Sequence, residues 1–382
     1  MILSNVHIIG QQGLKDIQIT GGLITTIAGA GDTETAGNIH FDNAIAFPGL
    51  INSHDHLDFN LFPQTGNSIY NNYTEWATDV QSKNKTSFDK VLQVPQALRT
   101  KWGLYKNLLN GFTTVVNHGK QLEIPEDLVT VLQNTHSLHS VMLEKKWKQQ
   151  LNNPFAKKQP YVIHAGEGTD AQSKEEIDEL LKWNLLKKEL IAVHGVAMEL
   201  RQAKQFKALV WCPASNYFLL NSTANIDQLK AETTILFGSD STLSSSWNIW
   251  EHLRQARQTG RATDKELFDM VTVNPASVWN LKNSGKLSIG GRADIVIAKR
   301  KNAADEYDAF FSLNPEDMLM IIQNGHIKYC DQSVSAVIDK NEFDKIRIGN
   351  GIKYVRRGIR TVIEQIERIY PEGDLLKSIN FA

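Results

Sequence analysis

Short apolar runs that each end in a histidine or an aspartate recur through the middle of the chain. Runs of about four to eight apolar residues, rich in valine and isoleucine, are typical of buried strands. The runs and their polar ends are residues 45–52 before His54, 113–117 before His118, 161–163 before His164, 191–193 before His194 and 233–239 before Asp240. One buried histidine at a strand end is usually structural, but five such ends are hard to explain by packing. The pattern predicts parallel strands that carry polar groups to one rim, as in a (β/α)8 barrel.

The first run is followed by two histidines separated by one residue, His54-Asp55-His56. Because strand side chains alternate between faces, we expect the imidazoles of His54 and His56 to point the same way and Asp55 to point to the other side. Two imidazoles at the exit of a strand suit one divalent metal ion. Two surface histidines in a loop are the alternative for such a pair alone. The later His and Asp strand ends favour the metal site.

The stretch between His118 and His164 is short for a regular barrel, which would place two complete βα units there. Residues 128–133 and 140–143 could each be a strand, so either the barrel is compressed or one strand is irregular. In both cases His136 and His139 are predicted to lie near the metal rim. There they could contact substrate or serve as loop or helix-cap residues.

Two helices have clear local signals. Ser173 is followed three residues later by Glu176, the pattern of a capping box, which predicts that a helix begins at Ser173. Near the C-terminus, apolar residues at positions 359, 362, 363 and 366 follow the i, i+3, i+4, i+7 spacing of an amphipathic helix. We expect this helix to pack on the barrel or on a second subunit.

The motifs together resemble those of the amidohydrolase superfamily of metal-dependent hydrolases, and the resemblance covers nearly the whole chain. It is carried by residues 48–56 (Pro-Gly-Leu-Ile-Asn-Ser-His-Asp-His), 274–276 (Asn-Pro-Ala) and 285–296 (Gly-Lys-Leu-Ser-Ile-Gly-Gly-Arg-Ala-Asp-Ile-Val). The most similar branch is that of the cyclic deaminases and the imidazolone-opening enzymes, because of residues 164–167 (His-Ala-Gly-Glu) and 212–216 (Cys-Pro-Ala-Ser-Asn).

The resemblance also implies a domain organisation in the α/β class. Residues 47–285, close to the length of about 250 typical of a barrel, would form a (β/α)8 TIM-like barrel, distorted or compressed as noted. Residues 1–46 and 286–340 are rich in strand patterns, and we expect them to pair into one small β-sandwich built from both chain ends. Residues 341–382 would form a C-terminal segment with the amphipathic helix.

The resemblance further implies a metal site and the roles of its residues. The implied ligands of one divalent ion are His54, His56, His164 and Asp240. Zinc is the first choice of metal, with iron or manganese as alternatives. Asp240 would also take a proton from the attacking water. Glu167, between Gly166 and Gly168, would turn back to the site and carry a proton to a ring nitrogen or the leaving group. His194 would polarise the substrate or hold the water, or else make only a supporting hydrogen bond.

Other site assignments are weaker. The family gives no fixed role at His118, which could contact substrate or be packed and hydrogen-bonded. Asn216 could touch substrate or brace its loop. Many relatives hold two metals with a carboxylated lysine, but the only candidates near a possible strand are Lys145 and Lys146. These two residues belong to a charged, solvated pattern, which favours one metal.

The chemistry of these groups predicts a hydrolase acting on carbon–nitrogen bonds other than peptide bonds. Hydrolytic deamination of an aminated heterocycle, with release of ammonia, is the first hypothesis. Hydrolytic opening of a cyclic amide or imide is the alternative, because the imidazolone hydrolases share the arrangement of His164 and Glu167. A third interpretation is a non-catalytic relative that keeps the fold for assembly or binding. The presence of every predicted ligand argues against it.

The composition of the chain argues against nucleic acid and membrane surfaces as partners. A net charge of −1, from 41 basic and 42 acidic residues, provides no broad field for nucleic acid or a membrane surface. The two cysteines make no disulfide framework and fit a reducing compartment. The N-terminus lacks the pattern of a signal peptide, and no apolar segment approaches the roughly 20 residues of a membrane span. We therefore expect a cytoplasmic protein that acts on a small molecule, with a homo-oligomer suggested only by the habit of its relatives.

Overall fold

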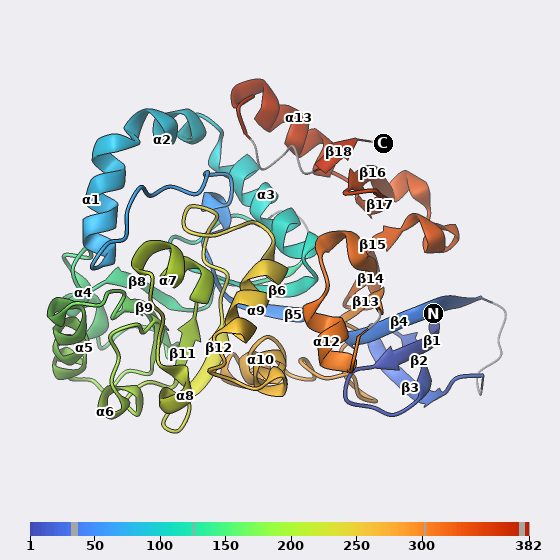
Figure 1. Cartoon of the computed structure of the whole chain (residues 1–382), viewed down its shortest axis with the longest axis horizontal. Helices are drawn as coiled ribbons and strands as arrows, with labels where there is room; N and C mark the ends of the chain where they lie inside the picture. The colour runs from blue at the N-terminus through green and yellow to red at the C-terminus, as the bar shows by residue number, and fades with distance from the viewer. Residues whose placement is uncertain (32–36, 125–126, 302, 374–378, 382) are drawn as a thin grey trace.

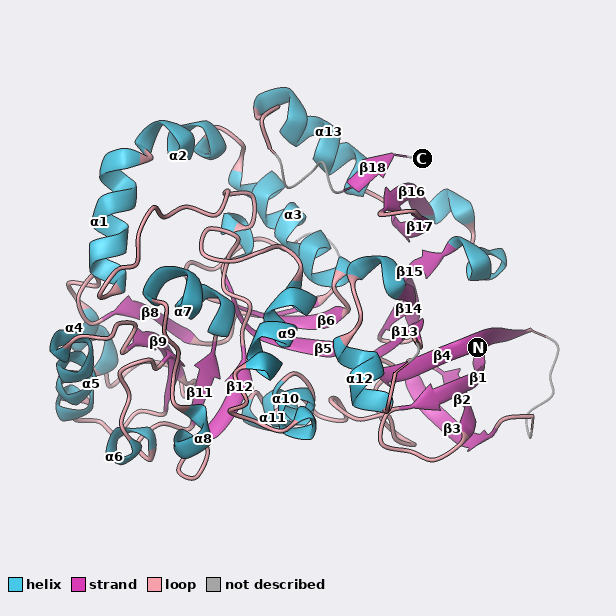
Figure 2. Ribbon diagram, viewed as in Figure 1, coloured by secondary structure: helices cyan, strands magenta, loops and turns pink. Residues whose placement is uncertain are grey.

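The computed structural model describes residues 1–31, 37–124, 127–301, 303–373 and 379–381. Its strands form three sheets of ten, five and three strands, with helices packed around the two smaller sheets (Figures 1 and 2). The two smaller sheets are parallel and together form the predicted α/β barrel. The strands of this barrel are β5 (Leu50–Asp55), β6 (Phe112–Asn117), β7 (Thr130–Leu132), β8 (His136–Ser140), β9 (Tyr161–Ala165), β10 (Leu190–His194), β11 (Ala208–Trp211) and β12 (Thr234–Phe237).

The helices mostly follow these strands in the alternating pattern of a barrel. They are α1 (Tyr73–Lys83), α2 (Lys85–Leu92), α3 (Gln96–Leu109), α4 (Trp147–Leu151), α5 (Ala171–Trp183), α6 (Leu200–Ala203), α7 (Pro213–Leu220), α8 (Ile226–Leu229), α9 (Ile249–Gln258), α10 (Asp264–Met270), α11 (Val273–Val278), α12 (Glu306–Phe311) and α13 (Ile359–Ile369). Among the described helices none is both long and apolar enough to cross a bilayer.

The first and last barrel strands meet at the metal rim. The amides of Ser239 and Asp240, just after β12, both donate to the carbonyl of His54 in β5 at 3.1 Å. A Cβ at Gly238 would lie 2.7 Å from the Cβ of His54, so this close approach requires glycine. Within the described ranges β5 and β12 share no strand ladder. These two hydrogen bonds, rather than a ladder, bring Asp240 beside His54 and His56.

The compressed part of the barrel is a split strand. β7 pairs with β6 and β8 pairs with β9, both in parallel, and only three residues separate β7 from β8. A return to the other end of the barrel needs a crossover of about a dozen residues. The two strands therefore run on in one direction, as successive halves of one path, and no helix lies between them. This explains why the segment between His118 and His164 is too short for two βα units.

Both ends of the chain contribute to the ten-stranded sheet. Its order is β18-β16-β17-β15-β14-β13-β4-β1-β2-β3, so the N-terminal β4 lies between β1 and β13. The strands are β1 (Ile2–Ile8), β2 (Leu14–Thr20), β3 (Leu23–Gly29), β4 (Asn38–Pro48), β13 (Ile295–Lys299), β14 (Met318–Gln323), β15 (His326–Asp331), β16 (Phe343–Ile348), β17 (Gly351–Arg356) and β18 (Ile379–Phe381). Short 3-10 turns occur at Leu57–Phe59, Pro315–Asp317, Gln332–Val337 and Lys340–Glu342. The sheet continues beyond residue 340, through β16 to β18.

Two helices can be compared with their sequence signals. The apolar stripe of α13 is buried and the helix lies against α3, a barrel helix. The helix predicted to begin at Ser173 begins two residues earlier, because Asp170 is the N-cap and accepts from the amide of Ser173. The predicted capping box is therefore wrong. Glu176 is instead buried and makes hydrogen bonds outside its own helix.

Candidate active site

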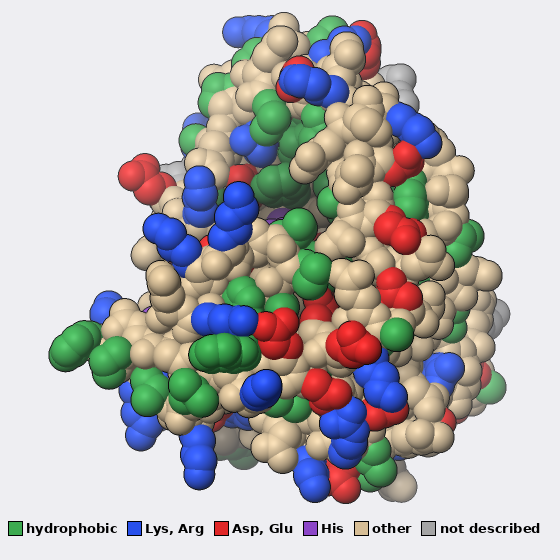
Figure 3. Space-filling model, turned by 90° about the vertical axis from the view of Figure 1, so that its left-hand side faces the viewer, with side chains coloured by type: hydrophobic (Ala, Val, Ile, Leu, Met, Phe, Trp, Pro, Cys, Tyr) green, Lys and Arg blue, Asp and Glu red, His purple; other side chains and the backbone are tan. Residues whose placement is uncertain are grey.

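A cavity of about 690 Å³ opens at the carboxyl ends of the barrel strands. Figure 3 shows it as a hollow in the surface, with histidine visible inside and hydrophobic side chains around it. The predicted site residues that line it are His56, His118, His139, His164, Glu167, His194 and Asp240. Six strand ends separated in the sequence thus contribute to one wall, because parallel strands end at the same rim.

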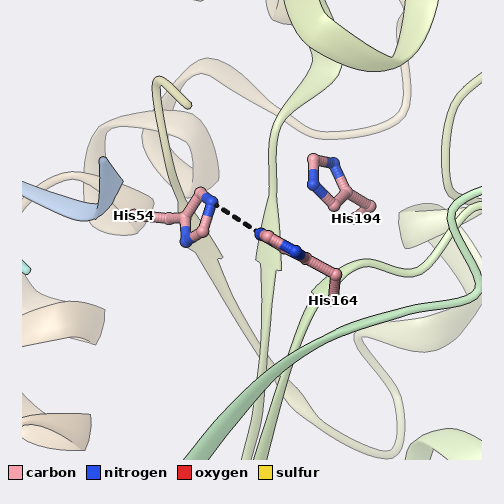
Figure 4. A group of neighbouring side chains, drawn as sticks. All are labelled: His54, His164 and His194. Carbon is pink, nitrogen blue, oxygen red and sulfur yellow. Dashed lines mark hydrogen bonds between the residues drawn. The ribbon is translucent and has the colours of Figure 1, made fainter. Parts of the chain in front are cut away.

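Donor atoms of the predicted metal ligands converge. Nε2 of His54 lies 3.3 Å from Nε2 of His164, and a dashed line joins these two nitrogens in Figure 4. Oδ1 of Asp240 lies 3.8 Å from Nε2 of His54 and 3.7 Å from Nε2 of His56. Donor atoms of His54, His164 and His194 also lie within 4.8 Å of one another. His54 belongs to both groups, so it stands at the centre of the cluster.

The chemistry and spacing of these donors fit a divalent ion. Metal–ligand bonds of about 2.0–2.2 Å to imidazole and carboxylate limit two ligands of one ion to a separation of about 4.3 Å. The separations of 3.3, 3.7 and 3.8 Å all meet this limit. Asp55, the residue between the two histidines, points to the other side, as the alternation of strand side chains predicts. The pairs His54–His164, His54–Asp240 and His56–Asp240 therefore have distances that one ion allows. The four donor atoms do not all lie within 4.8 Å of one another, because His164 groups with His54 and His194, whereas His56 and Asp240 group with His54.

Four histidines around the cavity, His54, His118, His139 and His164, have lowered pKa values that favour the neutral form. Burial lowers the pKa values of His54, His118 and His164 well below the usual range, and the neighbouring imidazoles lower them further. Burial likewise lowers the pKa of His139 to about 4, with His56 adding to the effect. A metal requires the neutral imidazole, so this environment favours ligation over protonation.

Asp240 is held as a carboxylate by three donors. Oδ2 accepts from the hydroxyls of Ser215 and Ser244 at 2.8 Å each, and Oδ1 accepts from the amide of Ser241 at 2.8 Å. Burial raises the pKa of Asp240, but the imidazoles of His194 and His56 and the two serine hydroxyls outweigh it and leave the pKa lowered. Its backbone has a φ of +55°, an unusual conformation that costs of order 1–3 kcal/mol and occurs often at functional sites.

Glu167 has the opposite electrostatic environment. Its side chain is buried, and burial together with the carboxylates of Asp240 and Glu176 raises its pKa well above the usual value. Oε2 lies 3.5 Å from Nε2 of His194. The turn that carries it is possible because Gly166 has a φ of +66°. The two cavity carboxylates are thus pushed apart in pKa, which is how an acid and a base are distinguished in one site.

His194 is oriented by Asn216. Nδ1 of His194 lies 2.9 Å from Oδ1 of Asn216, whose amide nitrogen donates to the hydroxyl of Thr223 at 3.2 Å. The amide oxygen accepts, so the proton of the neutral ring is on Nδ1 and the lone pair is on Nε2, which faces the cluster. Asn216 itself is fully buried and does not line the cavity. The structure therefore corrects its predicted substrate contact to a supporting role.

The remaining predicted contacts divide into two kinds. His118 and His139 line the cavity, and the ring centroids of His118 and His164 are 4.5 Å apart. Neither ring nitrogen of His118 has a hydrogen-bond partner among the described residues, so both are left for a ligand or water. The structure does not bring His136 to this cavity. Its position at the start of β8, away from the rim, leaves its ring stacked on Tyr161 with Nε2 2.9 Å from the carbonyl of Lys157.

A buried polar network lies beneath the metal rim, and sequence reasoning missed it. Lys106 of α3 is fully buried; its Nζ donates to Oδ1 of Asn60 at 2.8 Å and lies 3.4 Å from Oδ2 of Asp55. Asp55 also accepts from Asn107 at 2.7 Å and from Asn60 at 2.6 Å. The only available signal was Asp55 pointing away from the metal. Its partner on α3 cannot be found by spacing alone.

This network predicts a large loss of stability when the cation is removed. Lys106→Met would leave the Asp55 carboxylate buried without its ion-pair partner, so we expect the free energy of unfolding to fall by about 3–5 kcal/mol. Chemical denaturation measures it. Lys85→Met, which breaks the exposed pair with Asp89, is the control and should have far less effect. Equal losses for the two variants would contradict the assignment.

The chain is similar to known proteins in both sequence and structure. The model of the amidohydrolase family matches residues 155–328. A 5-methylthioadenosine/S-adenosylhomocysteine deaminase of Caldicellulosiruptor saccharolyticus is 24% identical over 362 residues, covering 77% of this chain and 82% of the relative. The crystal structure of an adenosine deaminase from Xanthomonas campestris with bound zinc has a TM-score of 0.72 at 12% identity, covering 98% of each chain. That of a guanine deaminase from C. acetobutylicum with bound guanine has a TM-score of 0.62 at 14% identity, covering 85% of this chain and 99% of the other.

The two kinds of match support different conclusions. At these identities the solved structures show the fold, and they confirm the predicted barrel. The family match adds the segment from before β9 to β15, which contains His164, Glu167, His194 and Asp240. Together with the deaminase relative, it confirms the resemblance to the amidohydrolase superfamily that the sequence motifs predict.

Proposed function

We propose that this protein is a metal-dependent deaminase that removes an amino group from a heterocycle by hydrolysis and releases ammonia. The observation that carries the proposal is the pairing of two unlike carboxyl groups in one cavity. Asp240 is held ionised beside the histidine cluster, whereas Glu167 is buried in an environment that keeps its proton. A hydrolysis that both activates water and protonates a leaving amine needs one group of each kind.

The relatives support the class of reaction as well as the class of substrate. The protein is a hydrolase that acts on carbon–nitrogen bonds other than peptide bonds, in keeping with its deaminase relatives. The relatives in the comparison are named for methylthioadenosine and S-adenosylhomocysteine, for adenosine and for guanine. All of these molecules contain a purine with an exocyclic amine, which supports an aminated heterocycle as the substrate class here.

One divalent ion is proposed, held by His54, His56, His164 and Asp240. Zinc is the first candidate, with iron or manganese as alternatives; the bound zinc of the adenosine deaminase supports this order. Lys145 and Lys146, the predicted candidates for a bridge between two metals, are exposed and do not line the cavity. When bound, the ion would lower the pKa of a water molecule towards neutrality and orient it.

The side chains of the chain itself supply the proton transfers. Asp240 accepts a proton from the attacking water at Oδ1, while Ser215 and Ser244 hold its Oδ2 in place. The water oxygen forms a bond to the ring carbon, and the bond from this carbon to the amine breaks. Glu167 gives its proton to the departing amine, which leaves as ammonia, or to a ring nitrogen, in which case the proton taken up by Asp240 passes to the amine. In the first case the proton on Asp240 returns to Glu167 after ammonia leaves. His194 offers its Nε2 lone pair to the water or ion, with Asn216 fixing its orientation.

The cavity walls suit a planar ring. Phe59, Trp76, Leu143, Leu219 and Leu243 provide apolar surface around the polar cluster. His118 and His139 are proposed to contact the polar edge of the ring, because both lie on the cavity wall and His118 has no protein partner among the described residues. A neutral imidazole can both donate and accept one hydrogen bond, which matches the mixed edge of an aminated heterocycle.

Ring opening of a cyclic amide or imide uses nearly the same groups, so the product must be measured. Ammonia release by the metal-reconstituted protein over a panel of aminated heterocycles is the test, with cyclic amides followed in parallel by absorbance. Ammonia from one ring supports deamination. Ring opening without ammonia would overturn it in favour of the cyclic amide. Purification without chelators tests the scaffold interpretation, which requires no bound metal.

The pairing of Asn216 with His194 predicts a loss of rate without a loss of fold. Asn216→Leu removes the acceptor at Nδ1, so the ring can turn or shift its proton. We expect kcat to fall about 10- to 100-fold, the usual effect of losing a residue that orients a metal-site histidine. Asn216→Asp keeps an oxygen acceptor and should retain most of the activity. Equal losses in the two variants, measured by steady-state kinetics, would contradict this role.

Two predictions from the sequence concern the cell rather than the site. A cytoplasmic location stays a prediction, supported by two cysteines that are both buried and free. A homo-oligomer also stays a prediction, for which sedimentation in solution is the direct measurement.

A further inference from the structure

Helix α1 contributes one wall of the cavity. Tyr73, Trp76 and Ala77 of α1 line it, and Asn72 caps the helix by accepting from the amides of Thr74 and Glu75. This helix follows the long segment after β5, far in sequence from the strands that carry the acid Glu167. In Figure 1 its first turn nevertheless lies close to β8 and β9.

The start of α1 is hydrogen-bonded to Glu167 and to the residues that follow it in the chain. The amide of Tyr73 donates to the carbonyl of Glu167 at 3.0 Å, and the amide of Thr169 donates to the carbonyl of Asn71 at 2.8 Å. Asn72 and Gly168 form an isolated antiparallel bridge. The chain that leaves Glu167 is thus joined to α1 as a short strand pair.

Glu176 is hydrogen-bonded to the residue that precedes Glu167. Its Oε1 accepts from the amide of Gly166 at 2.8 Å, and its Oε2 accepts from the hydroxyl of Tyr73 at 3.1 Å. The side chain of Glu176 is 3% exposed, so water does not compete for these bonds. The carboxylate of Glu176 thus links Gly166, the residue before Glu167, to Tyr73, whose amide donates to the carbonyl of Glu167. Tyr73 and Glu176 therefore hold Glu167 from both sides.

We propose that Tyr73 and Glu176 are positioning residues that aim Glu167 into the cavity and couple its orientation to the seating of α1. The inference rests on the proposed role of Glu167 as the proton carrier. Neither residue needs to touch the reacting atoms through its polar group: the Tyr73 hydroxyl is directed to Glu176, while its ring forms part of the cavity wall. Movement of α1 would alter the angle of the acid together with the shape of the cavity.

Tyr73→Phe tests the link with the smallest change, because the ring on the cavity wall is kept. We expect kcat to fall about 10-fold and KM to change little, since substrate contacts remain and only the acid is less well aimed. Glu176→Leu should lower kcat about 10- to 100-fold, whereas Glu176→Gln, which can still accept from Gly166 and bond to Tyr73, should retain most of the activity. Metal per chain should be unchanged in all three.

Tyr70→Phe is the matched control. Tyr70 is also buried, just before α1, and its hydroxyl donates to Asp79 at 2.7 Å rather than to the Glu167 turn. Its hydroxyl also accepts from the amide of Asn67 at 3.2 Å, so Tyr70→Phe loses two hydrogen bonds, and any general effect on this region would occur in it as well. We expect Tyr70→Phe to keep kcat close to that of the unchanged protein.

Two readouts separate this inference from the proposed function. Hydrogen–deuterium exchange over residues 164–170 needs no substrate: it should be faster in Tyr73→Phe and Glu176→Leu and unchanged in Tyr70→Phe. Unchanged exchange in both variants overturns the inference. In a Glu167→Gln background, Tyr73→Phe should cause no further loss of kcat, because the group that it aims is gone. A further 10-fold loss there would also overturn it. If Glu167→Gln alone is fully active, the proposed function fails, whatever the exchange data show.

Discussion

Asp240→Asn is expected to abolish turnover while leaving the fold intact. Asp240 lies beside His54 and His56 and is the proposed ligand and acceptor of the water proton, and a neutral amide does neither well. Combining the loss of a ligand with the loss of a base, we expect kcat/KM to fall about 10⁴-fold or more. Ammonia release measures the rate, and metal analysis of the same sample measures how weakly the ion is held.

The fold should tolerate this substitution for two reasons. Asparagine has the same shape as aspartate, and it adopts a positive φ, here +55°, more readily than most residues. Ser215 and Ser244 can turn their hydroxyls to suit the amide. Circular dichroism and the thermal midpoint should therefore stay close to those of the unchanged protein. Asp89→Asn, on the exposed end of α2, is the control for a charge change alone. Full activity of Asp240→Asn would refute both of its proposed roles.

Glu167→Gln is expected to reduce turnover about 10²- to 10⁴-fold, the contribution usual for a proton-transfer group, while the protein keeps its metal. The reason is that burial and the neighbouring carboxylates raise the pKa of Glu167 and so favour its protonated form, and glutamine has no acidic proton to give. Steady-state kinetics combined with metal analysis distinguish this variant from Asp240→Asn, which should lose rate and metal affinity together.

Glu175→Gln makes the same chemical change on the exposed face of α5 and should leave the rate unchanged. If Glu167→Gln lost its metal, the residue would belong to the ligand set and the division of roles between the two carboxyl groups would be wrong. If it kept its full rate, another group would have to protonate the leaving amine.

The metal cluster could be predicted because each of its members is marked locally. His54, His164, His194 and Asp240 each follow an apolar run, and strand periodicity alone shows that His54 and His56 share a face while Asp55 does not. In the structure Nε2 of His54 lies 3.3 Å from Nε2 of His164, and Oδ1 of Asp240 lies 3.8 and 3.7 Å from His54 and His56. Parallel strands in a barrel end at one rim, so the order of the motifs is sufficient to bring them together.

The supporting residues could not be predicted in the same way. Ser215 and Ser244 share one oxygen of Asp240, and Lys106 reaches Asp55 from a helix about fifty residues later. No period or spacing connects such pairs, because they depend on how a helix or loop packs on the barrel. His136 shows the converse error: the short segment between His118 and His164 suggested that both His136 and His139 lie near the rim, but His136 lies at the start of β8 and His139 near the end.

The sequence by itself predicted the family resemblance, the parallel strands, the candidate ion ligands and the proposed proton carrier, because these depend on residue type and on period along single strands. The tertiary structure alone decided the split of one strand into β7 and β8, the support of His194 by Asn216, and the hold of Tyr73 and Glu176 on Glu167. Each of these depends on distances of about 3 Å between residues far apart in the chain. Such distances follow from the packing of whole elements, and an isolated sequence motif contains no information on that packing.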